Sequence, residues 1–174
     1  VDPVRKTVAG DDGSVTPYDT LLLATGSSAW MPPIKGLDKD GVFTFRTLDD
    51  TRALLKRAGP DTRAIVIGGG LLGLEAARGL QMHGCQVTVV HLMATLMERQ
   101  LDPPGGKFLM AKMKELGIRV VLGKSTTAIL GNGHVERITG TLKAVFGTEA
   151  AVERADTGTL FFAQVAQVEL LNGI

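Results

Sequence analysis

The strongest constraint on the fold is a short β-branched run that ends in a glycine-rich turn and continues at once into a helix-forming segment. Residues 64–67 read Ala-Ile-Val-Ile, and the turn that follows begins at Gly68. In such a turn Gly68 permits a tight bend, Gly70 lets the backbone approach a phosphate closely, and Gly73 lets the helix pack against the strand. The helix start then offers unpaired N–H groups and roughly half a positive charge to an anion. The pattern predicts binding of a dinucleotide pyrophosphate.

The residues around this turn make the prediction specific, although glycine spacing alone is weak in a chain with 22 glycines among 174 residues. Leu72, Ala76 and Leu80 recur on one face of the predicted helix, Gly84 ends it, and residues 86–90 form a second apolar strand. An ordinary strand–helix turn that binds nothing is the alternative. The residues predicted to contact the pyrophosphate are Gly68, Gly69, Gly70, Leu71, Leu72 and Gly73.

Further elements follow from apolar runs, caps and breakers along the chain. Strands are predicted at residues 4–9, 18–24, 41–45 and 118–122, and a hairpin around Gly131-Asn132-Gly133 joins residues 126–130 to 134–138. Helices are predicted at residues 48–57, after a capping-box pair at Thr47 and Asp50, at 95–100 as a short polar piece, and from Asp102-Pro103 to Gly117. In the last helix, Phe108, Met110, Met113 and Leu116 are expected to face the core. Residues 139–174 show no convincing pattern.

Composition and charge exclude several classes of function. The net charge of +1 favours neither nucleic acid nor a membrane surface. No apolar run approaches the roughly 20 residues that span a bilayer, and no signal peptide is visible. The single cysteine, Cys85, excludes an internal disulfide, suits a cytoplasmic location and is expected to be buried at the start of the second strand. His83, His91 and His134 lack metal-ligand spacing, so no metal site is predicted.

Three motifs together resemble a known superfamily. Residues 18–27 (YDTLLLATGS) resemble the "ATG" motif of the two-dinucleotide-binding flavoprotein disulfide reductases, and residues 68–75 (GGGLLGLE) resemble their nicotinamide-nucleotide turn. Residues 91–102 (HLMATLMERQLD) are similar to the flavoprotein part of the large subunit of NAD(P)H-dependent assimilatory nitrite reductases. The resemblance covers about residues 1–138.

The resemblance implies a Rossmann-like, three-layer α/β fold that binds FAD and NAD(P)H. It divides the chain into part of an FAD domain (1–61), an NAD(P)-binding domain (62–138) and an unassigned segment (139–174). The family motifs imply further cofactor contacts at Thr25, Gly26, Glu75 and, at the domain junction, Arg46. Glu75 is expected near the contact of nicotinamide and flavin, while Thr25 and Gly26 approach FAD. No catalytic acid or base is predicted, because the cofactors carry the hydride.

The implied reaction passes hydride from a reduced nicotinamide to FAD. In a full-length relative, electrons then reach iron–sulfur and sirohaem centres that reduce nitrite to ammonia, so the rest of a larger reductase is an expected partner. A rubredoxin or ferredoxin reductase of the same superfamily is one alternative. A nucleotide-binding module without turnover is another.

The sequence departs from the family pattern at several places. His91 ends the second strand, where an acidic residue would accept the ribose 2′-hydroxyl of NAD. A neutral imidazole could accept that bond or stack on adenine, whereas an imidazolium would tolerate the 2′-phosphate of NADPH. A role for His91 at the strand edge alone is the alternative. No arginine follows closely, so NADH is the expected coenzyme.

Other expected parts of the superfamily pattern are absent from the sequence. It carries no first FAD-binding glycine turn, no redox cysteine pair and no cluster-binding cysteines. Residues 139–174 lack the expected glycine-rich strand exit, which suggests a truncated or frame-disrupted gene product. We therefore expect the isolated chain to bind NADH weakly and to retain no flavin.

Overall fold

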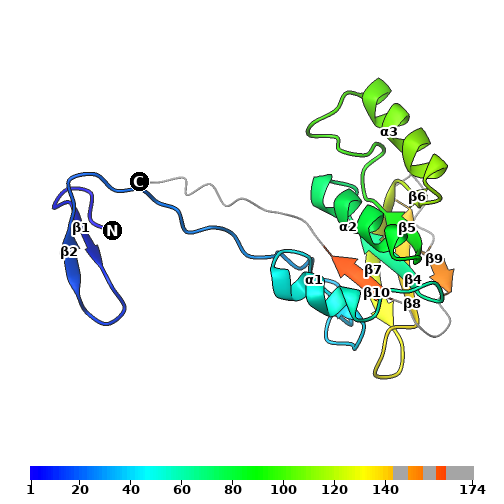
Figure 1. Ribbon diagram of the computed structural model, residues 1–174, viewed down its shortest axis with the longest axis horizontal. Coiled ribbons are helices and arrows are strands. Elements are labelled where there is room, and N and C mark those ends of the chain that lie inside the picture. Colours follow the sequence, from blue (N-terminus) through cyan, green and yellow to red (C-terminus); the bar gives the residue numbers. More distant parts are fainter. Residues whose placement is uncertain (143–148, 155–159, 164–174) are drawn as a thin grey trace. The chain divides into compact units, whose positions relative to one another are not determined.

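A computed structural model describes residues 1–142, 149–154 and 160–163. These residues fall in two compact units, one formed by residues 1–27 and the other beginning at Ser28 (Figure 1). Each unit is described by itself. The predicted boundary at residue 61 stays a prediction, and residues 28–61 pack within the second unit.

The first unit contains a small antiparallel hairpin, formed by β1 (Thr7–Ala9) and β2 (Val15–Pro17). A strand was expected within residues 4–9, and β1 lies there. The strand predicted at residues 18–24 is wrong, because β2 ends at Pro17 and no strand follows in that range. Leu22 is 85% exposed. An apolar run becomes a strand only beside a hydrogen-bonding neighbour, and in the described part of this unit β1 already pairs with β2.

The second unit is built on a parallel sheet with the strand order β3-β10-β4-β5-β6. Its strands are β3 (Val42–Phe43), β4 (Arg63–Ile67), β5 (Gln86–Val90), β6 (Arg119–Val121) and β10 (Leu160–Ala163). Four of them lie where strands were predicted. β10 lies in the segment for which the sequence predicted no element, and it pairs in parallel with both β3 and β4.

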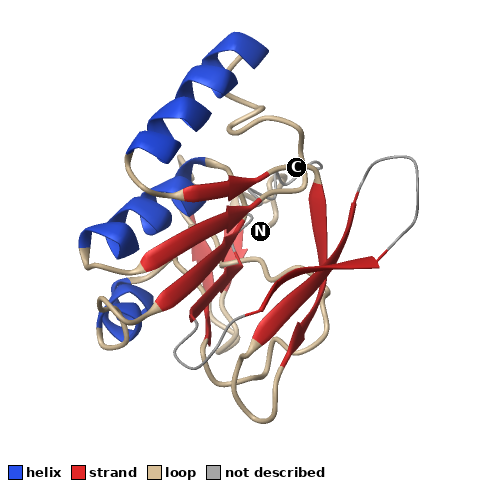
Figure 2. Ribbon diagram, turned by 90° about the vertical axis from the view of Figure 1, so that its right-hand side faces the viewer, coloured by secondary structure: helices blue, strands red, loops and turns tan. Residues whose placement is uncertain are grey.

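An antiparallel sheet of three strands forms a separate layer: β7 (Lys124–Leu130), β8 (Arg137–Leu142) and β9 (Glu149–Arg154). Figure 2 shows this sheet on one side of the parallel sheet and the helices on the other. The predicted hairpin is confirmed, since Leu130 pairs with Arg137 across the turn that contains Gly131 and Gly133. The three-layer α/β architecture expected from the sequence is therefore confirmed.

Each face of the parallel sheet is covered by an apolar core. Val66 and Val89 point to the helical side, where they pack with Ala77 and Leu80 of α2. On the other side, Ile65 packs in a second cluster with residues of the antiparallel layer. Such two-sided burial explains why β4 and β5 are nearly continuous apolar runs. Cys85, just before β5, is 4% exposed, as expected for a structural thiol.

The helices begin where capping residues predict. Helix α1 (Leu48–Leu55) starts with a capping box, in which Thr47 and Asp50 each accept the other's backbone N–H. Helix α3 (Pro103–Glu115) starts after Asp102, whose carboxylate accepts the Gly105 N–H at 2.8 Å. Helix α2 (Leu71–Met82) follows the glycine turn.

Two helical predictions need correction. Residues 95–100 form a hydrogen-bonded turn and not a helix: Met97 adopts a left-handed backbone with φ of 50°, and its carbonyl accepts the Gln100 N–H. In α3, Met113 is buried as expected, but Phe108 is 78% exposed and Met110 is 37% exposed. The buried residues of α3 are Gly106 and Met113, and a Cβ built on Gly106 would lie 3.2 Å from Thr95 in the 95–100 turn.

Among the described residues, no helix combines the length and apolarity needed to cross a membrane.

Candidate functional site

The glycine-rich turn lies at the carboxyl ends of two neighbouring strands, where open α/β sheets bind ligands. Strands β4 and β5 run side by side, with Ile67 opposite Val90. The next residue, Gly68, donates its N–H to the Val90 carbonyl at 2.9 Å and has a φ of +122°. Only glycine adopts that backbone without strain, so Gly68 makes the tight bend expected of it.

Gly70 and Gly73 have different surroundings. A Cβ built on Gly73 would overlap the Gly68 carbonyl oxygen, so the missing side chain lets α2 approach the turn closely. A Cβ built on Gly70 would meet no protein atom within 4 Å. Gly70 is also extended (φ −82°, ψ 179°), a conformation open to any residue. Neither neighbouring protein atoms nor backbone strain therefore explains a glycine at position 70.

The start of α2 is suited to an anion. Gly70 is the N-cap and provides no side-chain acceptor for the first-turn amides. The first turn carries no acidic residue that would repel a phosphate. Leu71 is 53% exposed, which leaves the end of the helix accessible. Backbone amides and the helix dipole can stabilise a pyrophosphate there.

His91 lies against the turn and uses both ring nitrogens. The Gly69 N–H donates to His91 Nδ1 at 3.0 Å, so Nδ1 carries no proton. The proton is therefore on Nε2, which donates to Glu98 Oε2 at 3.0 Å. The ring is buried, with 10% of the side chain exposed. This network holds a neutral imidazole in one tautomer.

Two hydrogen bonds hold Glu98 near the glycine turn. Its side chain accepts from His91, which bonds to Gly69, and the N–H of its neighbour Met97 donates to the Gly69 carbonyl at 3.0 Å. Partial burial raises the pKa of the Glu98 carboxyl, but interactions that favour the carboxylate, chiefly hydrogen bonds from His91 and from its own backbone N–H, outweigh burial and lower the pKa overall. Glu98 is thus a carboxylate at neutral pH.

The other predicted cofactor contacts lie on different elements. Glu75 is exposed on α2, in the helix that starts at the turn. Arg46 immediately precedes the α1 cap, and its backbone N–H donates to Asp50 at 2.8 Å. Thr25 and Gly26 belong to the first unit, where Gly26 has a φ of +72°. Their contacts with a coenzyme stay predictions.

Sequence reasoning missed the link between the turn and Glu98. Residues 91–102 were identified only by resemblance, and their lack of periodicity hid the packing of Leu96, which is fully buried against Gly69. The sequence feature that could have indicated this link is the acidic residue Glu98, seven positions after His91. In the described part of the chain, no three His, Cys, Asp or Glu side chains gather in a way that could hold a metal ion.

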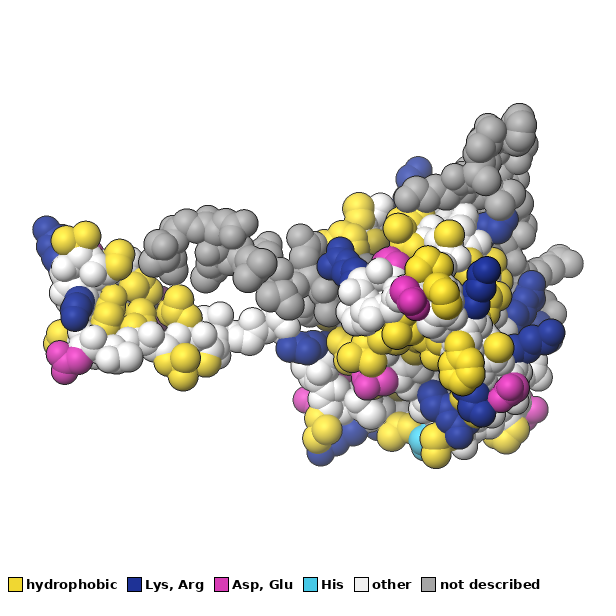
Figure 3. All heavy atoms as spheres, turned by 90° about the horizontal axis from the view of Figure 1, so that it is seen from above, with side chains coloured by type: hydrophobic (Ala, Val, Ile, Leu, Met, Phe, Trp, Pro, Cys, Tyr) yellow, Lys and Arg dark blue, Asp and Glu magenta, His cyan; other side chains and the backbone are white. Residues whose placement is uncertain are grey.

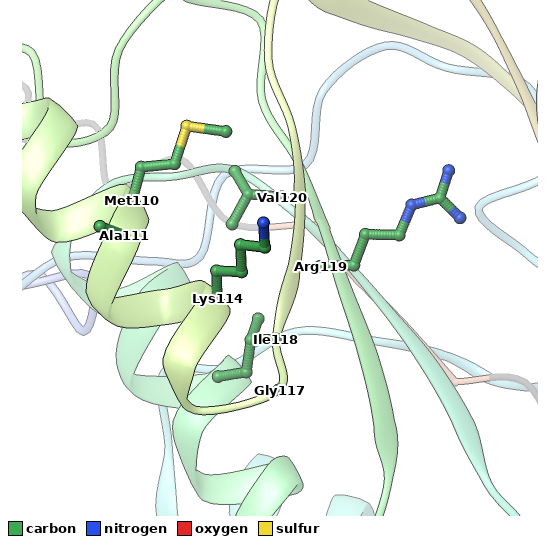
Figure 4. Close-up of a pocket in the computed structure, with 7 residues that line it drawn as sticks. All are labelled: Met110, Ala111, Lys114, Gly117, Ile118, Arg119 and Val120. Carbon is green, nitrogen blue, oxygen red and sulfur yellow. The ribbon is translucent and has the colours of Figure 1, made fainter.

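A separate hollow of about 420 Å³ lies between α3 and β6. It is mainly apolar, and Figure 4 shows Lys114 directed toward Val120 and Arg119 directed away from α3. This hollow opens at the amino end of β6, whereas the glycine turn lies at the carboxyl ends of β4 and β5. The view onto the α3 side shows exposed apolar side chains interspersed with basic ones (Figure 3).

Comparison with protein families identifies one match over most of the chain. The model of the pyridine nucleotide-disulphide oxidoreductase family matches residues 1–163. It extends past residue 138, where the resemblance was expected to end, and includes β10.

Two curated relatives are nitrite reductases. The chain is 48% identical over 136 residues to nitrite reductase [NAD(P)H] of Bacillus subtilis (strain 168), a match covering 78% of this chain and 17% of that protein. It is 39% identical over 149 residues to the nitrite reductase (NADH) large subunit of Escherichia coli (strain K12). That match covers 86% of this chain and 17% of that protein. The chain thus spans less than a fifth of these relatives.

Among solved structures, the covalent putidaredoxin reductase–putidaredoxin complex resembles this fold with a TM-score of 0.76 and 27% sequence identity. The similarity covers 92% of this chain and 38% of that chain.

Proposed function

The chain belongs to the pyridine nucleotide-disulphide oxidoreductase family, and we propose that it supplies the nicotinamide-coenzyme site of an FAD-dependent oxidoreductase. The glycine turn between β4 and α2 binds the pyrophosphate of NAD(P)H. Bound there, the coenzyme supplies hydride, which FAD accepts. The protein's part is to bind and orient the two cofactors.

The observation that supports this proposal is the contrast between Gly70 and Gly73. Packing explains Gly73, because a side chain there would overlap Gly68. It does not explain Gly70, which is open on its Cβ side and adopts an ordinary backbone. A pyrophosphate lying against Gly70 accounts for the missing side chain, since a methyl group would hold it away from the helix amides.

Each residue of the site has a distinct role in this proposal. The amides at the start of α2, from Gly70 to Leu72, donate to the phosphate oxygens. Glu75, one turn further along the exposed surface of α2, is proposed to lie near the nicotinamide. Thr25 and Gly26 in the first unit are proposed to approach FAD. Arg46, just before the N-cap of α1, is proposed to contact a cofactor.

A single methyl group tests the pyrophosphate site. We expect Gly70→Ala to weaken NADH binding at least about tenfold, a loss of about 1.4 kcal/mol. The protein should stay folded, with only a modest fall in melting temperature, because alanine is a poorer N-cap than glycine. Isothermal titration calorimetry and thermal melts measure the two effects. Gly79→Ala is the matched control, because Gly79 lies within α2 and its added Cβ also meets no atom within 4 Å. Equal NADH affinity in wild type and Gly70→Ala would contradict the assignment.

For the whole protein, we propose a nitrite reductase that converts nitrite to ammonia. The identity to two nitrite reductases supports this choice. Iron–sulfur and sirohaem groups, which would receive electrons from FAD, are proposed to be held by other parts of the larger reductase. The test is nitrite-dependent NADH oxidation by the full-length protein.

A reductase that passes electrons to a small iron–sulfur protein is the second candidate. It is supported by the similarity of the fold to putidaredoxin reductase. NADH-dependent reduction of an added rubredoxin or ferredoxin, without nitrite turnover, would favour this candidate.

A further inference from the structure

The ribose end of the coenzyme lacks its usual acceptor in this chain. In Rossmann folds a carboxylate at the end of the second strand accepts the ribose 2′-hydroxyl of NAD. Here His91 follows that strand, and Gly69 and Glu98 engage its two nitrogens. Its one acceptor nitrogen is occupied by the Gly69 N–H. While these bonds last, His91 has no lone pair left for a ribose hydroxyl.

The Glu98 carboxylate lies one imidazole ring away from the Gly69 amide. Its side chain is 30% exposed, whereas that of His91 is 10% exposed, so Glu98 is the partner that solvent and ligands reach. A carboxylate offers about four acceptor positions, and the bond from His91 uses one of them. Glu98 therefore retains the capacity to accept a ribose hydroxyl.

The segment that carries Glu98 is held in place and is not a free loop. Leu96 is fully buried, and its side chain lies beside Gly69. Met97 donates to the Gly69 carbonyl and adopts a left-handed backbone, an unfavourable conformation for a non-glycine residue that surrounding contacts must maintain. The fold thus fixes a carboxylate beside the glycine turn.

On the basis of the proposed coenzyme site, we infer that Glu98, oriented by His91, is the residue that selects NADH over NADPH. The carboxylate accepts a hydroxyl of the adenosine ribose and repels the 2′-phosphate of NADPH. His91 is a positioning residue that bonds to the turn on one side and to Glu98 on the other. The acidic function normally carried by the residue after the second strand is thereby moved to a residue seven positions later.

The test is the Glu98→Gln variant, titrated with NADH and with NADPH by calorimetry. Glutamine keeps a side-chain oxygen for the His91 Nε2–H, so the variant should fold, which a thermal melt checks. Exchanging a charged acceptor for a neutral one should weaken NADH binding about fivefold. Loss of the repulsion should strengthen NADPH binding. The Kd for NADPH divided by the Kd for NADH should therefore fall at least about tenfold.

Glu115→Gln is the control, because it removes the same charge from an exposed site on α3. A second measurement uses NADH with a 2′-deoxyadenosine moiety. The wild type should bind this analogue more weakly than NADH, whereas Glu98→Gln should bind the analogue and NADH with the same affinity.

Three outcomes overturn the inference. A wild-type protein that binds NADPH more tightly than NADH would contradict it. A Glu98→Gln variant whose ratio of NADPH to NADH dissociation constants changes no more than that of Glu115→Gln would also contradict it. Both of these leave the proposed pyrophosphate site intact. A wild type that binds neither coenzyme removes the proposed function and this inference together.

Discussion

At the residue scale, the glycines of one turn are required for different physical reasons. Gly68 provides a backbone conformation, Gly73 provides space against the Gly68 carbonyl, and Gly70 leaves an open surface. Gly69 has a further role, because a Cβ there would lie 2.8 Å from the His91 ring. Motif spacing predicts glycine at these positions, but it does not show which glycines the fold requires and which the ligand requires. Substituting one glycine at a time distinguishes the two reasons.

We expect Gly73→Ala to lower the free energy of unfolding by about 1–3 kcal/mol, because the added methyl group must displace backbone. Urea denaturation measures the change. Gly79→Ala, on the same helix but without an overlapping neighbour, should raise it by up to about 1 kcal/mol. An unchanged unfolding midpoint in Gly73→Ala would show that α2 does not approach the turn as closely as described.

At the scale of single elements, side chains next to each helix start decide where it begins. The Asp50 carboxylate accepts the N–H groups of Thr47 and Arg46 and the hydroxyl of Thr44. Burial raises the pKa of Asp50, but these hydrogen bonds outweigh burial and lower the pKa overall. Asp50 thus orders the turn before α1, which also contains Arg46.

This shift predicts a pH dependence of stability. A carboxyl whose folded pKa is depressed stabilises the protein above its ordinary value of about 3.9, and the contribution is lost as the pH falls through the folded pKa. We expect Asp50→Asn to be less stable than wild type by about 1 kcal/mol at pH 7, with the difference shrinking below about pH 4. Urea unfolding across this range measures it. Asp49→Asn, a neighbouring exposed carboxylate, should show a smaller and flatter difference. A difference for Asp50→Asn that persists unchanged at low pH would contradict the assignment.

At the scale of the whole molecule, the two units hold different parts of the proposed cofactor machinery. The pyrophosphate turn lies in the second unit, and the predicted FAD contacts Thr25 and Gly26 lie in the first. The sequence has no additional strand–glycine–helix turn that would hold the FAD pyrophosphate.

We therefore expect the purified chain to bind NADH weakly, to retain no flavin and to show no NADH oxidase activity. Visible absorbance of the purified protein and NADH titration with and without added FAD measure these properties. A yellow preparation with one FAD per chain would contradict the expectation.

The expectations that held are those that depend on neighbours in the sequence. The β4–α2–β5 unit, the caps of α1 and α3 and the β7–β8 hairpin all follow from local patterns of apolar, capping and glycine residues. The predicted strand at 18–24 failed because pairing depends on a neighbouring strand. The predicted inward face of α3 was wrong at Phe108 and Met110, because the helix buries Gly106 and Met113, and no apolar side chain marks Gly106 as an inward position.

By itself, the sequence determined the type of fold and the position of the nucleotide turn, because a strand, a tight turn and a helix start are specified within a few residues of one another. Only the tertiary structure decided what His91 does and placed Glu98 beside the turn. Those contacts join residues 7 to 22 positions apart through side chains, and chain folding, not local preference, brings such side chains together. The same holds for β10, whose place between β3 and β4 depends on pairing with strands far away in the sequence.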